Sequence, residues 1–504
     1  MNPSLILPIL LPFMVGIALL FTHPVHYQRR LSLIAAAALL PLAALLLITA
    51  GDDYHAYALG NWPTPFGIVL VLDRLSALML LLTALVALPA LWYAVATNAD
   101  TQGRYFHPLF QFQLMGLNGA FLTGDLFNLF VFFEIVLIAS YCLLLHGGGR
   151  ERIRAGLHYV ILNLVGSALF LIAIGVLYGM TGALNLADLA VRVAAAPAED
   201  AGLLRAGALL LLVVFGLKAA VLPLYFWLPT AYAHASAPVA ALFALLTKVG
   251  IYSIIRVFSL VFGADAGAVA HVAAPYLLPL ALATVAVGSV GVLASQDLHR
   301  LIGYSVIVSI GILLTGVGLG QASGLSAALV YLVHTTLITA GLFLLADLIA
   351  GQRGHAGSQP SSPVSQPFIL GSLFFIGAVA VAGMPPLSGF LGKLLLLRAA
   401  EGTLALPWVW SVALGSSLLV IVALGRMGSS LFWNTLESPA MAAPAPFQQW
   451  WPAAVLLAAG PLLMLLARPV LDYATATARQ LREPAAYVET VLANRYLVLA
   501  RRQP

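Results

Sequence analysis

The feature that most constrains this chain is a long series of apolar stretches, each of about 20 residues, joined by short polar connections. Hydrophobic residues make up 62% of the 504 residues and charged residues only 8%, and the mean hydropathy is +1.01. A soluble globular protein carries roughly 25% charged residues. The sequence therefore predicts an all-α, polytopic membrane protein, because in lipid the backbone amides of a helix find their hydrogen bonds within the segment.

The apolar stretches predict about 14 transmembrane helices. The first stretch has no basic start and another span follows it at once, so we interpret it as a helix and not as a cleaved signal peptide. The predicted spans are 3–22, 30–50, 71–96, 107–124, 126–146, 157–180, 204–229, 237–262, 273–295, 299–320, 324–350, 367–397, 404–433 and 450–468.

Three segments outside the spans are polar enough to lie in water or at the membrane surface. The amphipathic stretch 181–203 is expected to be a loop, and residues 351–367 (GQRGHAGSQPSSPVSQP) are expected to be a flexible linker. The tail 469–504 carries five arginines, and we expect it to lie along the membrane surface or against a partner. No water-soluble domain is left, so we expect no cofactor and no metal in this chain.

Charge, cysteine content and motifs exclude several other functions. The net charge of +5 comes from 23 basic and 18 acidic residues spread thinly along the chain, which argues against nucleic acid as a partner. The single cysteine, Cys142, rules out an intrachain disulfide. No P-loop, CxxC or HExxH motif is present, and the HGGG run at 146–149 has no nucleophile elbow, so it is interpreted as a helix stop.

The distribution of arginines predicts the orientation, because loops rich in Lys and Arg stay in the cytoplasm. An N-terminus outside the cell puts three arginines in the outer loops, namely Arg192, Arg205 and Arg398. It puts eight in the inner loops: Arg29, Arg30, Arg104, Arg150, Arg152, Arg154, Arg300 and Arg353. This count favours an outside N-terminus, although 14 spans then leave the basic tail outside as well.

The three lysines of the chain all lie inside apolar spans, whereas nearly all of the 20 arginines lie in loops, at span ends or in the tail. Each of Lys218, Lys248 and Lys393 would cost roughly 2.5–3.5 kcal/mol at mid-membrane without water or a counter-ion. Arginine stays protonated, whereas a buried lysine can lose its proton. We therefore expect these lysines to titrate, the alternative being that they extend to the interface or neutralise a structural carboxylate.

Among the acidic residues, Glu134 stands out in the middle of a span, in FNLFVFFEIVLIASY. It is a candidate counter-ion for a buried lysine, or one half of a purely structural ion pair between helices. Asp125 lies nine residues earlier, at the edge of the same span. We expect Asp125 to cap the helix end.

Two spans are predicted to be broken next to a lysine. Pro223 follows Lys218 by five residues, and Pro385 and Pro386 precede Lys393 in AVAVAGMPPLSGFLGKLLLL. Proline removes a backbone donor and bends or breaks a helix. Broken helices in corresponding halves of a membrane protein point to an ion path at mid-membrane.

Two histidines extend this candidate path. His334 lies mid-span in LVYLVHTTLITAGLFLLA, and His234 follows the first break. A histidine can pass a proton near neutral pH, and it can equally make a static hydrogen bond between helices. Both interpretations stay open for both residues.

Several of these segments together resemble the antiporter-like subunits shared by complex I and the Mrp cation/proton antiporters. The likeness runs from about residue 60 to 435 and includes LTGDLFNLFVFFEIVLIASY, GLKAAVLPLYFWLPTAYAHASAPVAALFALLTKVGIY, QDLHRLIGYSVIVSIG and GMPPLSGFLGK. The first of these phrases and the tail are most similar to the D-type subunits of the Mrp antiporters. The resemblance implies a proton-translocating subunit of a sodium/proton antiporter in the bacterial inner membrane, assembled with subunits of the A, B, C, E, F and G types.

The resemblance also implies an internal division of the chain. Residues 1–106 would form helices 1–3, residues 107–262 a first five-helix repeat, and residues 273–433 a second, inverted repeat. Residues 434–504 would form helix 14 and the tail. Helices 7 and 12 would be the broken ones, each within its own half-channel.

By the same resemblance, Glu134 corresponds to the family glutamate that pairs with Lys218, Lys248 bridges toward the centre, and Lys393 is the terminal group. A close Glu134–Lys218 pair would hold the lysine protonated, and opening it would send the proton toward Lys248, His334 and Lys393. A pair 4 Å apart at a dielectric constant of 20 is worth about 4 kcal/mol.

The chain departs from the family pattern at two places in the second repeat. Many relatives carry HxxxxK on helix 11, whereas Thr339 stands at the position of that lysine, five residues after His334. Ser309 stands on helix 10 where relatives often have a histidine or another polar residue. The relay in this half would therefore depend on His334, hydroxyl groups and water.

Two other functions are compatible with the sequence. The chain could be a pump subunit of a complex I or membrane-bound hydrogenase, driven by electron transfer in partner chains. It could also be a non-conducting scaffold. Co-purifying iron–sulfur absorbance would indicate the first, and normal transport with a Lys218→Ala variant would indicate the second.

Overall fold

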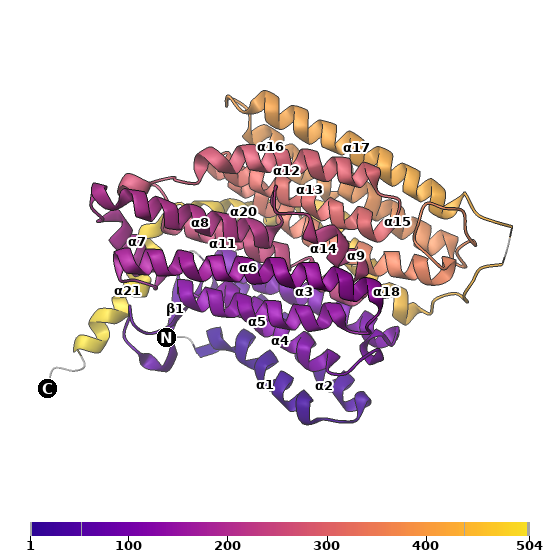
Figure 1. Ribbon diagram of the computed structural model, residues 1–504, viewed down its shortest axis with the longest axis horizontal. Helices are drawn as coiled ribbons and strands as arrows, with labels where there is room; N and C mark the ends of the chain where they lie inside the picture. Colours follow the sequence, from indigo (N-terminus) through magenta and orange to yellow (C-terminus); the bar gives the residue numbers. More distant parts are fainter. Residues whose placement is uncertain (1–2, 52, 438, 501–504) are drawn as a thin grey trace.

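The computed structural model describes residues 3–51, 53–437 and 439–500, and most of them are helical (Figure 1). Most helices run side by side along the long axis of the molecule, with α1 and α2 at one edge of the bundle and α17 at the other. The helices up to residue 260 are α1 (Leu7–Phe21), α2 (Val25–Thr49), α3 (Arg74–Ala96), α4 (Phe106–Leu122), α5 (Leu126–Leu145), α6 (Arg150–Thr181), α7 (Leu186–Ala194), α8 (Ala201–Ala219), α9 (Trp227–His234), α10 (Ala237–Phe243) and α11 (Leu246–Leu260).

The remaining helices form the other half of the bundle and the C-terminal segment. They are α12 (Ala274–Ala294), α13 (Leu298–Gly318), α14 (Ala322–Arg353), α15 (Pro367–Ala382), α16 (Ser388–Ala399), α17 (Leu406–Phe432), α18 (Phe447–Leu457), α19 (Ala459–Leu465), α20 (Ala467–Gln480) and α21 (Pro484–Ala500).

Eleven helices in the described part of the chain are long and apolar enough to cross a membrane, and the bent helix that includes α18–α20 would make twelve. The prediction of a multi-pass, mostly helical membrane protein is confirmed. Five predicted spans depart from a simple single helix: α4 has 17 residues, three spans are each divided into two helices (α8 and α9, α10 and α11, α15 and α16), and the chain turns by 85° before α20.

Both predicted breaks are present. The predicted span 204–229 ends as α8 at Ala219 and resumes as α9, and Pro223 lies in the irregular stretch between them. The predicted span 367–397 is divided into α15 and α16, with Pro385 and Pro386 between them. A further break, between α10 and α11, was not predicted, because residues 244–245 are Ala and Leu and carry no proline or glycine signal.

The predictions for the polar segments need correction. Residues 181–203 are not simply a loop but contain α7, whose first turn is capped by the Asn185 side chain, which accepts hydrogen bonds from the amides of Ala187 and Asp188. Residues 351–367 are irregular after Arg353, as expected. This segment is held by hydrogen bonds and is not a free linker, however, because the buried Arg353 guanidinium donates to the carbonyls of Gly357 and Ser430.

A short antiparallel sheet, absent from the prediction, lies at one end of the bundle. Strand β1 (His55–Ala58) pairs with β2 (Val69–Leu72), with His55 opposite Leu72. The C-terminal segment packs on the same end, where α21 contacts β1 and α7, and α20 contacts α3 and α14. The tail was expected at the membrane surface or against a partner; α20 and the first turns of α21 lie on this chain's own elements, the last turns of α21 project from the bundle (Figure 1), and residues 501–504, with Arg501 and Arg502, are outside the described residues.

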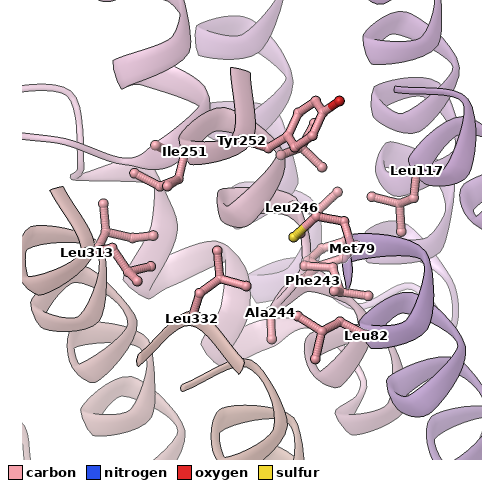
Figure 2. Close-up of a cluster of buried hydrophobic side chains, with 14 of the residues drawn as sticks. Met79, Leu82, Leu117, Phe243, Ala244, Leu246, Ile251, Tyr252, Leu313 and Leu332 are labelled. Carbon is pink, nitrogen blue, oxygen red and sulfur yellow. The ribbon is translucent and has the colours of Figure 1, made fainter. Parts of the chain in front are cut away.

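The helices before residue 262 and those after residue 273 pack together around an apolar core. Figure 2 shows part of it, in which Met79 and Leu82 of α3 lie near Phe243 of α10, Leu246 of α11 and Leu332 of α14. These side chains are almost completely buried. A polar side chain in this region that lacks a partner on a neighbouring helix is costly.

Candidate functional site

The first break, between α8 and α9, frees backbone groups that other helices satisfy. The Leu222 amide donates to the hydroxyl of Thr284 on α12 at 3.0 Å. The indole of Trp227 donates to the Leu217 carbonyl at 3.2 Å. Non-helical backbone is tolerated at membrane depth only where such partners exist. The break is thus stabilised by hydrogen bonds with the side chains of Thr284 and Trp227.

Lys218 lies in the last turn of α8, directly before this break, and its side chain is buried, with 4% of the residue exposed. Its ammonium Nζ donates to the backbone carbonyl and to the side-chain oxygen of Asn163 on α6, both at 3.3 Å. It also lies 3.4 Å from the Ser167 hydroxyl, one turn further along α6. The amine is therefore surrounded by acceptors that stabilise its protonated form.

Glu134 on α5 reaches Lys218 only through Ser167. The Ser167 hydroxyl donates to Glu134 Oε1 while its oxygen can accept from Lys218 Nζ. The two charged groups, both in the described part of the chain, form no direct ion pair. The expected Glu134–Lys218 contact is thus a three-membered chain in which one serine hydroxyl connects the carboxylate to the ammonium.

Lys248 lies on α11, just after the break between α10 and α11, and is completely buried. Its Nζ makes no hydrogen bond with any residue that the structure describes. Leu246 and Ile251, on either side of it along α11, belong to the apolar core of Figure 2. Helix α11 packs against α8, which carries Lys218, and against α13 of the other half.

Lys393 lies on α16, just after the second break, and the residue is 6% exposed. Its Nζ donates to the carbonyls of Val381 and Ala382 at the end of α15, at 3.3 and 2.9 Å. It also donates to the Ser417 hydroxyl on α17 at 2.9 Å. The last carbonyls of a helix lack partners within the helix, so a cation is favourable there.

His334 on α14 contacts the same break. Its Nδ1 is 2.8 Å from the hydroxyl of Ser388, the first residue of α16. Its ring also packs against Gly389, because a Cβ added there would lie 2.9 Å from Nε2. The short helix α16 thus connects the two residues: His334 contacts its first residue, and Lys393 lies within it.

The other candidate residues are less closely connected. His234, at the end of α9, is half-buried and bonds to its own helix through the Thr230 carbonyl at 2.8 Å. Ser309 is buried and donates to the Val306 carbonyl, and Thr339 is buried on α14. The structure brings together Glu134 and Lys218 at one break and His334 and Lys393 at the other. It shows no hydrogen bond from His234, Ser309 or Thr339 to either group.

Asp125 caps α5, as expected, because its carboxylate accepts a hydrogen bond from the Asn128 amide at 2.7 Å. Two acidic groups with partners on distant helices were missed. The buried Asp73 forms a double hydrogen-bonded ion pair with Arg256 of α11, at 2.6 and 2.7 Å, and the partly buried Asp347 of α14 accepts from the hydroxyl of Tyr93 at 2.7 Å. Both lie near the ends of predicted spans, where an acidic residue is ordinarily interpreted as an interface residue.

Comparisons with known proteins agree with this arrangement. The family described as NADH:quinone oxidoreductase/Mrp antiporter, TM, matches residues 123–422. The D-type subunit of a probable K⁺/H⁺ antiporter of Rhizobium meliloti is 44% identical, with 97% of each chain covered. The D-type subunit of the Na⁺/H⁺ antiporter of Bacillus subtilis is 38% identical, covering 98% of this chain and all of the relative.

Solved structures show the same fold over nearly the whole chain. A chain of the Mrp complex from Dietzia sp. DQ12-45-1b superposes with a TM-score of 0.86 at 27% identity, covering 98% of this chain and 100% of its own length. A chain of respiratory complex I from Thermus thermophilus gives 0.79 at 27% identity, covering 95% and 99%. This chain therefore belongs to the family of antiporter-like transmembrane subunits found in NADH:quinone oxidoreductases and Mrp antiporters.

Proposed function

We propose that this chain is the proton-translocating subunit of a multi-subunit monovalent cation/proton antiporter, with Na⁺ as the exchanged cation. It would work in the bacterial inner membrane with subunits of the A, B, C, E, F and G types. The observation that carries the proposal is the pairing of each broken helix with a buried lysine, Lys218 at one break and Lys393 at the other. Relatives that match over nearly their full length are named as D-type subunits of such antiporters.

In this proposal the proton moves along lysines that exchange it in turn. Glu134 favours protonated Lys218 through Ser167, because a nearby opposite charge stabilises the charged form of an amine. Movement of α5 relative to α6 would break the serine bridge and remove that stabilisation. Lys218 then gives its proton to Lys248, from which it passes through His334 to Lys393 and the opposite side.

The architecture we propose has 14 crossings in two inverted repeats, residues 107–262 and 273–433, with residues 1–106 before them and 434–504 after them. Counting α4 and the α15–α16 pair as crossings brings the twelve apolar spans to 14. The similar construction of the two lysine-bearing breaks supports the repeats. Pro223 and Pro386 would mark equivalent positions in them.

We also propose that the N-terminus lies outside the cell. The end of the bundle that we place in the cytoplasm carries Arg29 near the start of α2, which pairs with Asp100 at 2.7 Å, and the start of α13, where the Leu298 amide bonds to the Ala356 carbonyl at 2.9 Å. Lys- and Arg-rich loops stay in the cytoplasm. The opposite end, with the β1–β2 sheet and α21, would face outward.

Two alternatives have specific support. The 44% identical relative is named as a subunit of a K⁺/H⁺ antiporter, so potassium is a second candidate cation. The likeness to a complex I chain supports a redox-driven pump. Antiport that responds to potassium and not to sodium would select the first alternative, and iron–sulfur absorbance in the purified complex would select the second.

The function is tested by expressing the whole set of subunits and following proton movement in inverted vesicles with a fluorescent dye as sodium is added. A Glu134→Ala variant is expected to lose exchange while the complex still assembles on a native gel. Glu151→Ala, an exposed acidic residue on α6, is the matched control and should exchange normally. Normal exchange with Glu134→Ala would contradict the proposed path. Normal exchange with Lys218→Ala would support the alternative that the chain is a non-conducting scaffold.

A further inference from the structure

A cavity of about 500 Å³ lies at the end of the bundle where α5 meets the loop before α4, away from the lysine path. Its wall is formed by Leu20 at the end of α1 and by Leu109 and Phe112 of α4. Its polar rim is formed by Arg104 and by His146, the residue that ends α5. The cavity thus combines an apolar trough between helices with basic groups at one end.

The two basic groups of the rim have no partner among the described residues. Arg104 is exposed and makes no hydrogen bond or ion pair with any of them, and neither ring nitrogen of His146 has a hydrogen-bond partner there, although that residue is only 6% exposed. The acidic residue of the same loop, Asp100, is already engaged by Arg29 at 2.7 Å and His107 at 3.0 Å. The rim therefore offers the positive charge of Arg104, which no carboxylate of the described chain neutralises, and the imidazole of His146 as a hydrogen-bonding group.

The position of His146 is fixed by its surroundings. Its ring packs edge-on against Phe106 with a centroid distance of 5.1 Å, and its carbonyl accepts a hydrogen bond from Arg152. The backbone of Gly103 closes over the ring, since a Cβ added there would lie 3.1 Å from Nε2. A buried ring nitrogen without a well-formed hydrogen bond is costly, and a ligand group at the rim would supply the missing partner.

The wall of the cavity indicates what kind of ligand this is. Leu20 and Leu145 are about two-fifths exposed, so the trough opens onto the apolar outer surface of the bundle. A soluble anion would bind at the rim but would leave this trough unfilled. A molecule with an anionic head and an apolar chain fills both parts, and basic pockets between helices near the cytoplasmic surface suit anionic lipid head groups.

We propose that this cavity binds an anionic phospholipid, whose phosphate contacts Arg104 and His146 and whose acyl chain lies along Leu20, Leu109 and Phe112. The lipid would connect α1 to α4 and α5. Helix α5 also carries Glu134, so the bound lipid would hold that helix in place. The lipid site does not depend on the proposed antiport activity, and its test below measures no transport.

The test uses Cys142, which lines the cavity, is exposed, and is the only cysteine of the chain. The assembled complex is purified in detergent and mixed with phosphatidylglycerol or with phosphatidylcholine of the same acyl chains. The rate of maleimide labelling at Cys142 is followed by peptide mass spectrometry. Phosphatidylglycerol is expected to slow labelling about fivefold more than phosphatidylcholine, because one arginine contributes about that factor to anionic lipid binding.

Arg104→Gln is expected to abolish this difference between the lipids. Arg154→Gln removes the same charge from an exposed position outside the cavity and should leave the difference unchanged. If the first variant does not assemble, Leu109→Trp, which fills the trough, should abolish the difference as well. Equal protection by both lipids, protection by inorganic phosphate alone, a Cys142 that never reacts, or a difference that survives in Arg104→Gln or Leu109→Trp would overturn the proposal.

Discussion

At the scale of single residues, the three buried lysines differ in what surrounds their ammonium groups. Lys218 and Lys393 each have three hydrogen-bond acceptors, whereas Lys248 has none among the described residues. Acceptors favour the protonated amine, and an apolar surrounding favours the neutral one. A proton that crosses the bundle would therefore rest at the two breaks and pass quickly through the centre.

Ser167 is the residue on which the link between Glu134 and Lys218 depends. Ser167→Ala removes the one hydroxyl in the described chain that bonds to both, so the carboxylate loses its connection to the ammonium. Hydrogen bonds to charged groups are worth about 1.5–3 kcal/mol, so we expect sodium-driven exchange to fall about tenfold or more. The measurement is dye-reported proton movement in inverted vesicles.

Ser253→Ala is the matched control for this variant. Ser253 is also completely buried, but its hydroxyl bonds only to the Val249 carbonyl of its own helix. Exchange should remain close to normal in that variant. Equal exchange rates in Ser167→Ala and Ser253→Ala would mean that the serine bridge has no part in transport.

The sequence could predict the lysines and Glu134 because a charge inside an apolar span is rare and costly. It could not predict Ser167, Asn163 or Ser417, since small polar residues occur throughout such helices and only the packing of α5, α6, α8 and α17 shows which of them face an ammonium group. Charge is visible in a sequence, whereas the neutral partner of a charge is not.

At the scale of helices, the breaks are stabilised by side chains from other helices. At the first break the Thr284 hydroxyl accepts from the Leu222 amide and also donates to the Leu280 carbonyl. Thr284→Val leaves that amide without an acceptor, which costs about 1–3 kcal/mol for a buried donor. We expect a lower midpoint of thermal unfolding for the purified complex.

Thr315→Val serves as the comparison for Thr284→Val. Thr315 is buried on α13 and its hydroxyl bonds only to the Gly311 carbonyl of its own helix, so its loss leaves no amide unpaired. This variant should change the unfolding midpoint little. If both variants unfold alike, Thr284 does not support the break.

Proline made two of the three breaks predictable, since Pro223 and Pro386 remove backbone donors wherever they stand. The interruption before Lys248 was not predictable, because Ala244 and Leu245 are good helix formers that keep helical backbone angles, and only the backbone hydrogen-bond pattern changes there. Helix α7 was missed for a related reason: with nine residues it is too short to cross a membrane and resembles an amphipathic loop.

At the scale of the whole molecule, a buried ion pair joins distant parts of the chain. Arg256 of α11 pairs with Asp73 before α3, and its guanidinium contacts the rings of Tyr252 and Tyr487, the latter on α21. Burial by itself would raise the pKa of Asp73, but the charge and hydrogen bonds of Arg256 outweigh it and hold the pKa below its usual value of 3.8. The pair therefore stabilises the fold above about pH 4 and loses this contribution as the pH falls through the lowered pKa.

Arg256→Met is expected to lower the free energy of unfolding by about 3–5 kcal/mol, because it leaves the buried Asp73 carboxylate without its counter-ion. The double variant with Asp73→Asn should recover part of this loss. Tyr487→Phe should have little effect on the unfolding midpoint, since the Tyr487 hydroxyl makes no hydrogen bond with the described residues. Thermal unfolding of the purified complex measures all three, and an unchanged midpoint in Arg256→Met would contradict this role.

The general fold of the molecule was predictable from the spacing of apolar stretches, but the position of its C-terminal segment was not. An amphipathic tail can lie on lipid, on a partner or on its own chain, and the sequence is the same in each case. The structure shows that Tyr54 donates to the Gln480 carbonyl at 2.8 Å and Tyr473 to the Arg74 carbonyl at 2.7 Å. Contacts of this kind depend on residues hundreds of positions apart.

The proposed transport requires Lys218 to gain and lose a proton in each cycle. Lys218→Arg tests this requirement, because arginine keeps the positive charge and can still donate to Asn163 and Ser167 but does not deprotonate. Sodium-driven proton exchange would be measured in inverted vesicles that contain the assembled complex. We expect exchange to be lost while assembly stays intact. Exchange at the normal rate in Lys218→Arg would show that Lys218 supplies only a fixed charge, and would contradict the proposed proton path.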